Sequence, residues 1–279
     1  MNATPPASIA TALWASKPLP QKALATIVLA GFVLQGLLSA IECVGQFLAD
    51  SSSGTALWQS LFAGLATAIG AVLLATLQRP SPRGLGIAMA IAAGAMSMAA
   101  ILTLLIPASQ HEAASPTTIA LALGVGAALM FLIDRALPHE HPQPDAKRLP
   151  ATASRRAAWL LVVAITLHNF PEGFAVAAAA AGTGGTVTAT AIALQNIPEG
   201  LIIAAVLWAI GLRRSVAIGI AAASGLAEPV GALLGIVWLD AIPGAAPSAM
   251  ALAAGAMLFV VAHELLPTAV RALASWRAG

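Results

Sequence analysis

Long apolar runs constrain this 279-residue chain more than any other feature of its sequence. Eight runs, most of them near the roughly 20 residues that cross a bilayer as an α-helix, alternate with short polar stretches. They lie at about 24–43, 56–77, 84–107, 117–134, 157–181, 186–209, 215–238 and 248–268. Because a helix satisfies its own backbone hydrogen bonds in lipid, the runs predict an all-α membrane protein. We expect a bundle of about eight transmembrane helices.

The composition excludes a water-soluble domain. Charged residues make up only 9% of the chain and hydrophobic residues 59%, with a mean hydropathy of +0.89. A soluble protein carries roughly 25% charged residues, so these charges could not cover a water-facing surface. The expected surroundings are a lipid bilayer, and no nucleic-acid partner is expected.

The positions of the basic residues predict the orientation in the membrane. All 13 lysines and arginines fall on one side if every run spans the bilayer. The loops of the opposite side carry only Asp50, Glu112 and Asp240, together with His111. Cytoplasmic loops are enriched in lysine and arginine. Both termini of this chain are therefore expected in the cytoplasm.

The runs also divide the chain into segments. We expect a cytoplasmic N-terminal segment (1–23), four membrane helices (24–134), and a proline-rich cytoplasmic loop (135–156) containing His139 and His141. Three further helices (157–238) and a last helix with a short tail (239–279) follow. The run at 24–43 follows two lysines and could be a cleaved signal peptide. We expect a retained helix, since the run is long for a signal and no A-x-A site ends it.

A repeated polar motif interrupts two neighbouring runs, as "LHNFPEG" (167–173) and "LQNIPEG" (194–200). His168 and Glu172 are four residues apart, which places both on one helix face. Gln195 and Glu199 repeat that spacing. Pro171 and Pro198 lack an N–H, so each should kink its helix and leave it partly unwound. Because the two helices run in opposite directions, the motifs predict a central, kinked inverted-repeat pair.

Three carboxylates, Glu172, Glu199 and Glu228, are expected at similar depth in three consecutive helices. Each would cost roughly 2.5–3.5 kcal/mol against lipid, so we expect them to converge. Like charges that converge in a low dielectric need protons or a cation, and the neighbouring His168 favours a cation. A purely structural kink motif would explain the prolines and glycines but not the glutamates.

The donor set narrows the choice of ion. One imidazole, three carboxylates and several amide oxygens suit borderline divalent metals: Zn²⁺ first, with Cd²⁺, Fe²⁺ or Mn²⁺ as alternatives. All-oxygen sites for Mg²⁺ or Ca²⁺ would not require a histidine. A two-metal centre is plausible because the three glutamates would oppose a charge of +4.

At "HNFPEG", "QNIPEG" and "SGLAEPVGALLG" the chain resembles the ZIP family of divalent-metal transporters, closest to its prokaryotic GufA-like branch. The resemblance is specific across 157–238 and weaker over 56–136 and 253–267. It implies one metal site made by His168, Glu172, Gln195 and Glu199. It implies a second made by Asn169, Glu172, Asn196, Glu199 and Glu228, with two glutamates bridging.

The same resemblance implies metal influx toward the cytoplasm, with the site-bearing helices moving against a scaffold in a bacterial inner membrane. Accessory metal residues are implied near the cytoplasmic mouth (Asp134, His139, His141), where an ordinary solvated loop is the alternative. His263 and Glu264 are implied at the inner exit. Relatives normally have one more helix after this segment, so the family's final helix is expected to be absent from this chain.

The sequence leaves competing functions open. A transporter needs no catalytic residue or cofactor, and we expect this chain not to be an enzyme. An intramembrane metal-dependent hydrolase could use the same side chains with an activated water, and is the alternative. A non-transporting scaffold is disfavoured by the buried charges. A homodimer is compatible with the sequence, which does not predict the oligomeric state.

Overall fold

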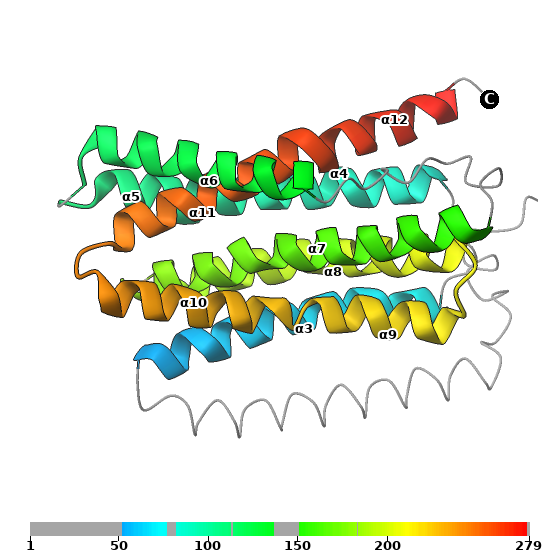
Figure 1. Cartoon of the computed structure of the whole chain (residues 1–279), viewed down its shortest axis with the longest axis horizontal. Helices are drawn as coiled ribbons and strands as arrows, with labels where there is room; N and C mark the ends of the chain where they lie inside the picture. The colour runs from blue at the N-terminus through cyan, green and yellow to red at the C-terminus, as the bar shows by residue number, and fades with distance from the viewer. Residues whose placement is uncertain (1–51, 77–81, 113, 137–150, 183, 278–279) are drawn as a thin grey trace, which may run out of the picture. The chain divides into compact units, whose positions relative to one another are not determined.

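The computed structural model describes residues 52–76, 82–112, 114–136, 151–182 and 184–277. Every regular element in these residues is helical, which confirms the all-α prediction. The helices form long rods that run alongside one another (Figure 1). Six of the rods are long and apolar enough to cross a membrane. The predicted run at 24–43 lies outside the described residues.

The rods follow the remaining seven predicted runs. They are α3 (Ser52–Thr76); α4 (Pro82–Met98) continued by the π-helical segment η1 (Ala99–Leu105) and α5 (Ile106–Gln110); α6 (Pro116–Ala136); α7 (Ala151–Ala180); α8 (Gly185–Ala209); α9 (Arg214–Ser224) followed by α10 (Ala227–Ala241); and α11 (Ala246–Val260) continued by the π-helical segment η3 (Val261–Leu265) and α12 (Leu266–Arg277).

Two expectations about helix boundaries are wrong. Helix α7 begins at Ala151, inside the predicted loop 135–156, so the polar stretch contributes to the helix. Pro171 and Pro198 lie within α7 and α8, and both helices continue through them without the predicted unwinding. A proline removes one helical hydrogen bond, and packing against neighbouring helices keeps the rest of the backbone helical. The break occurs instead at Gly225–Leu226, between α9 and α10.

The rods pack in two groups. Helix α3 packs on α8, α9 and α10, and α7 packs on α8 and α10. We call α3, α7, α8, α9 and α10 the polar-core half, for reasons given below. Helix α6 packs on α11, and α4 packs on α12. We call α4, α5, α6, α11 and α12, with η1 and η3, the apolar-core half. Contacts of α4 with α8 and of α7 with α11 join the two groups (Figure 1).

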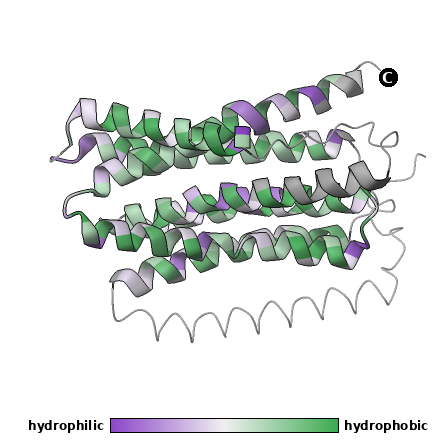
Figure 2. Cartoon of the chain, viewed as in Figure 1, coloured by the Kyte–Doolittle hydropathy of each residue, from purple (hydrophilic) through white to green (hydrophobic). Residues whose placement is uncertain are grey.

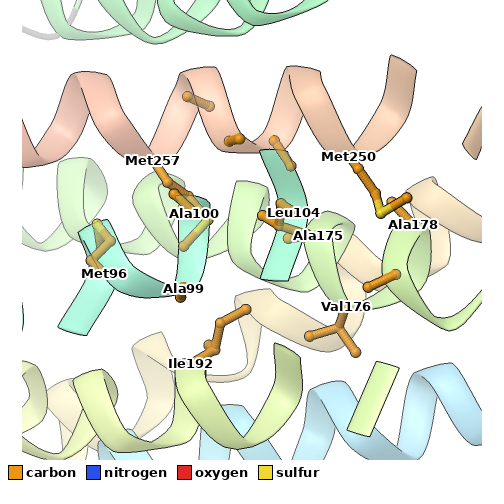
Figure 3. Close-up of a cluster of buried hydrophobic side chains, with 14 of the residues drawn as sticks. Met96, Ala99, Ala100, Leu104, Ala175, Val176, Ala178, Ile192, Met250 and Met257 are labelled. Carbon is orange, nitrogen blue, oxygen red and sulfur yellow. The ribbon is translucent and has the colours of Figure 1, made fainter. Parts of the chain in front are cut away.

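A hydrophobic cluster fills the junction between the halves. Its members include Met96 of α4, Leu104 of η1, Val176 of α7, Ile192 of α8 and Met257 of α11 (Figure 3). All five side chains are buried. The rest of the cluster is mostly alanine, whose small side chain lets the backbones of membrane helices approach closely.

Glycines mark the closest helix crossings in both halves. A Cβ at Gly200 of α8 would overlap the backbone carbonyl of Thr67 of α3. A Cβ at Gly255 of α11 would likewise overlap the carbonyl of Leu123 of α6. Small residues at such crossings let helix backbones touch in the membrane. Both halves are therefore built by the same packing chemistry.

Candidate metal centre

Three helices of the polar-core half carry the predicted carboxylates. Glu172 lies in α7, Glu199 midway along α8, and Glu228 in the first turn of α10. Glu172 and Glu228 are fully buried, and Glu199 is 9% exposed. Figure 2 shows hydrophilic residues in the middle of the α7 and α8 rods, away from their ends.

Two amides on α8 connect these carboxylates. Gln195 Nε2 donates a hydrogen bond of 2.5 Å to Glu172 Oε1 on α7. Asn196 Nδ2 donates one of 2.6 Å to Glu228 Oε1 on α10. Since Gln195 and Asn196 are adjacent in sequence, one turn of α8 holds a carboxylate on either side. Both amides are buried.

The break between α9 and α10 orients a third amide. In an unbroken helix the N–H of Glu228 would bind the carbonyl of Ser224. Here it binds the carbonyl of Gly225 at 3.2 Å. The carbonyl of Ser224 instead accepts a hydrogen bond of 3.0 Å from Asn169 Nδ2. A carbonyl can only accept, so the nitrogen of Asn169 must face Ser224 and its oxygen must point elsewhere.

Asn196 is oriented in the same way. Its Nδ2 also donates a hydrogen bond of 2.9 Å to the backbone carbonyl of Ala63 in α3. The amide oxygen therefore faces away from α3. Sequence analysis does not predict the contributions of Ala63 and Ser224, because every residue carries a carbonyl and no sequence pattern distinguishes these two.

Six buried oxygens of this cluster have no hydrogen-bond partner among the described residues. They belong to the six predicted oxygen donors: Asn169 Oδ1, Glu172 Oε2, Gln195 Oε1, Asn196 Oδ1, Glu199 Oε2 and Glu228 Oε2. Buried polar atoms are normally paired, and unpaired carboxylate oxygens are the most costly to bury. Oxygens that accept and do not donate are the atoms that a divalent cation stabilises.

The side chains do not form a ready ligand cage. Within the described ranges, no three histidine, cysteine, aspartate or glutamate side chains lie together as a group that could hold a metal. The N–H groups of Gln195 and Asn196 stand between the carboxylates instead. Rotation of the Gln195 amide would replace its donor with an oxygen ligand beside Glu172, whereas Asn196 is held in its orientation by the Ala63 carbonyl.

The predicted histidine pairs across the two halves. His168 Nε2 lies 3.1 Å from Glu264 Oε1, which belongs to η3 in the apolar-core half. The family resemblance implies a role for Glu264 at the inner exit, which stays a prediction, and in the structure its carboxylate lies against the His168 imidazole. π-Helical segments occur frequently at functional sites.

The other accessory residues are only partly described. His263 Nδ1 lies 3.6 Å from Asp134 Oδ2, which joins η3 to the end of α6. The His263 ring also stacks on Phe259, with ring centroids 5.0 Å apart. His139 and His141 lie outside the described residues. The structure thus brings Asp134 and His263 together.

Comparison with known proteins identifies the family. The profile of the family described as "ZIP Zinc transporter" matches residues 134–277, more than half of the chain. Zinc transporter ZupT of Escherichia fergusonii is 40% identical over 131 residues, which are 44% of this chain and 49% of that protein. The ZupT protein of Salmonella arizonae is 38% identical over 130 residues, with the same coverage.

The chain therefore matches about half the length of these curated relatives. The matched family region contains the two repeated motifs and Glu228. It also contains His263 and Glu264 of η3. It confirms the resemblance found in the motifs. The chain belongs to the ZIP zinc transporter family.

Proposed function

We propose that this chain carries divalent metal ions, zinc first, across a membrane through the cluster of Glu172, Glu199 and Glu228. The observation that carries this proposal is the set of six buried oxygens without hydrogen-bond partners in the described structure. A negatively charged cluster of that kind is costly in a membrane unless a cation binds it. The names of the ZupT relatives agree with zinc as the cargo.

The donors divide between two ions. His168, Glu172, Gln195 and Glu199 would bind one, and the imidazole makes this the site that favours zinc. Asn169, Asn196 and Glu228, with Glu172 and Glu199 bridging, would bind the other through oxygen. The orientation of Asn169 by the Ser224 carbonyl, and of Asn196 by the Ala63 carbonyl, supports the second site because it aims their oxygens away from the backbone.

The arginines suggest the direction of transport. Arg83, Arg213, Arg214 and Arg271 belong to one end of the rods, which we call the basic end (Figure 1). His111, Glu112 and Asp240 belong to the opposite, acidic end. The positive-inside rule places the basic end in the cytoplasm. The family resemblance implies influx toward the cytoplasm, and with this orientation we infer that metal enters at the acidic end and leaves at the basic end of an inner-membrane protein.

The contact between His168 and Glu264 suggests how the halves move. It joins α7 of the polar-core half to η3 of the apolar-core half. Metal binding through Nε2 of His168 would compete with this contact, because that nitrogen cannot bind a metal ion and Glu264 at the same time. Binding of the metal ion would then break the His168–Glu264 contact between the halves, and alternating access requires such contacts to break. Asp134 and His263 would act beyond this link, as accessory residues for metal release.

Zinc uptake into proteoliposomes tests the proposal. The intact protein should accumulate zinc above empty vesicles, and Glu172→Gln should lower the initial rate by at least about 100-fold, because it removes a bridging ligand. Glu112→Gln makes the same chemical change on an exposed loop and should leave the rate unchanged. Normal uptake by Glu172→Gln in correctly inserted protein would exclude the assigned site.

Transport is better supported than the alternative of an intramembrane hydrolase. The family is described by zinc transport, and the prediction that the chain is not an enzyme agrees with it. A hydrolase would need a proton-transfer group distinct from the ligands. In the proposed assignment, the titratable groups of the described cluster all serve as metal ligands, which leaves none of them for proton transfer. The GufA-like branch and a homodimeric state stay predictions.

A further inference from the structure

Hydroxyl groups inside these helices usually bind a backbone carbonyl of the preceding turn. Ser97 donates to Ala93, Thr103 to Ala99, Thr166 to Val162 and Thr190 to Thr186, at 2.7–2.8 Å. This bond is the common way for serine and threonine to satisfy themselves in an apolar helix.

Ser60 of α3 and Thr188 of α8 do not follow this pattern. Both side chains are 0% exposed. Neither hydroxyl oxygen has a hydrogen-bond partner in the described part of the chain. A buried hydroxyl without a partner is unfavourable, although in both helices the preceding turn offers one. The two hydroxyls are therefore candidates for contact with an ion or its hydration water inside the helix bundle.

Ser60 lies on the face of α3 that leads to the metal cluster. It precedes Gly64 by one turn, and Gly64 lies beside the carboxylate of Glu228. One turn in the other direction, Ala56 packs with Ala177 of α7 and Ala232 of α10. Residues spaced by four share a helix face. Ser60 therefore lies between α3, α7 and α10, about 6 Å along the axis from the level of Gly64.

Thr188 occupies a corresponding place on α8. It precedes Gln195 by two turns on the same helix face, a separation of about 10 Å along the axis. Helices α3 and α8 both begin at the acidic end (Figure 1). Ser60 and Thr188 thus both lie between that end and the glutamates.

A side-chain bridge joins α3 and α8 near these hydroxyls. Gln59 Nε2 donates a hydrogen bond of 2.8 Å to Thr186 Oγ1. The bond fixes the orientation of the Gln59 amide. Its Oε1 is buried, without a hydrogen-bond partner in the described ranges, and lies beside Gly185. Gln59, Ser60 and Thr188 each offer a neutral oxygen on the acidic-end side of the cluster.

We propose that the oxygens of Gln59, Ser60 and Thr188 form an approach site through which a partly hydrated divalent cation reaches the glutamate cluster from the acidic end. The inference rests on the proposed function and adds the entry route to it. Neutral oxygens bind the water shell of an ion without holding the ion as strongly as carboxylates do. Weak sites in series allow an ion both to enter and to move on.

The double variant Ser60→Ala/Thr188→Val tests the approach site. It removes both hydroxyls with little change in volume, and should lower the initial rate of zinc uptake at subsaturating zinc by about tenfold. The amount of zinc bound at equilibrium by the purified protein should stay as in the unchanged chain. The matched control is Ser97→Ala/Thr190→Val, whose hydroxyls are satisfied by carbonyls; its uptake rate should be unchanged.

A second measurement does not depend on uptake. Ser60 is buried in the described structure, so the approach site must open for a reagent to reach it. In a Cys43→Ser background, Ser60→Cys should react with a small maleimide and zinc should slow that reaction; no reaction at position 60 would contradict the approach site. Ser97→Cys should show no effect of zinc. If the double variant fails to insert into the membrane, this assay still tests whether zinc occupies the approach site.

The outcomes separate the two proposals. Uptake by the unchanged chain together with normal uptake by the double variant would overturn the approach site alone, as would a maleimide reaction at position 60 that zinc does not slow. Absence of uptake by the unchanged chain would overturn the proposed function. In that case, protection at position 60 by zinc would still support an ion-binding approach site.

Discussion

The two halves of the described structure pack in the same way but bury different side chains. Every buried polar side chain in the described residues belongs to the polar-core half: Ser60, Thr67, His168, Asn169, Glu172, Thr188, Gln195, Asn196, Glu199, Ser224 and Glu228. The buried side chains of α4, η1, α5, α6, α11, η3 and α12 are apolar. Both halves contain glycine crossings and alanine-rich contacts.

This contrast separates packing from function. Close helix crossings need small residues, and the apolar-core half, where no described polar side chain is buried as a whole, shows that tight contacts form without one. The polar groups of the other half are therefore not needed to pack the helices. They are costly in a membrane, and the metal centre is the reason proposed here for keeping them.

In the absence of zinc, the largest effects of substitution on stability should come from the crossings, equally in both halves. Gly200→Ala and Gly255→Ala each place a methyl against a backbone carbonyl, and each should lower the free energy of unfolding by about 2 kcal/mol. Gly124→Ala, where nothing lies within 4 Å of the added Cβ, should be neutral or stabilising by about 0.5 kcal/mol. Thermal unfolding in detergent measures all three. A loss confined to one half would contradict the view that both pack alike.

Zinc should stabilise the protein only through the polar-core half. A ligand that binds the folded state at 100 times its Kd adds about 2.7 kcal/mol of stability, which raises the unfolding temperature. Glu228→Gln should abolish most of this rise because it removes a carboxylate from the cluster. Met257→Leu, in the apolar cluster, should keep the full rise. Equal zinc-induced shifts in both variants would place the metal elsewhere.

Asn169→Leu should lower zinc affinity by about 10- to 100-fold, since it removes an oriented amide oxygen. The matched control is Ser224→Ala. The Ser224 hydroxyl binds the carbonyl of Ala221 at 2.8 Å, and the control keeps the Ser224 carbonyl that orients Asn169. Isothermal titration with zinc should show unchanged affinity for Ser224→Ala. Equal losses in both variants would mean that the region acts through packing alone.

The smallest effect is expected from Met250→Leu in α11. Its side chain lies in the apolar cluster (Figure 3), and a swap that conserves volume should cost less than about 1.5 kcal/mol. Zinc uptake should stay within about twofold of the unchanged chain. A strong loss of uptake without loss of stability would show that the apolar-core half contributes to transport directly.

Most of the fold was predictable because each membrane helix is marked by a continuous apolar run in the sequence. The seven described rods match predicted apolar runs, since a span needs about 20 apolar residues whatever its neighbours are. The unwinding at Pro171 and Pro198 was predicted wrongly, because the effect of a proline depends on the helices that pack around it. The break at Gly225–Leu226 and the π-helical segments were not predicted for the same reason.

The site was predictable in its residue types more than in its connections. Spacing placed His168 with Glu172, and Gln195 with Glu199, because i and i+4 positions share a helix face. It could not show that Glu264 lies against His168, since that contact depends on how η3 meets α7. Nor could it find the unpaired hydroxyls of Ser60 and Thr188, which in sequence look like any other serine or threonine in a helix.

By itself the sequence determined that this chain forms membrane helices and which side chains could bind metal, because hydropathy and side-chain chemistry are properties of the residues alone. Only the tertiary structure decided which of these side chains meet, which backbone carbonyls orient Asn169 and Asn196, and which oxygens stay without partners. Those features arise from the crossing of separate helices, where the position of one residue depends on every contact of its helix.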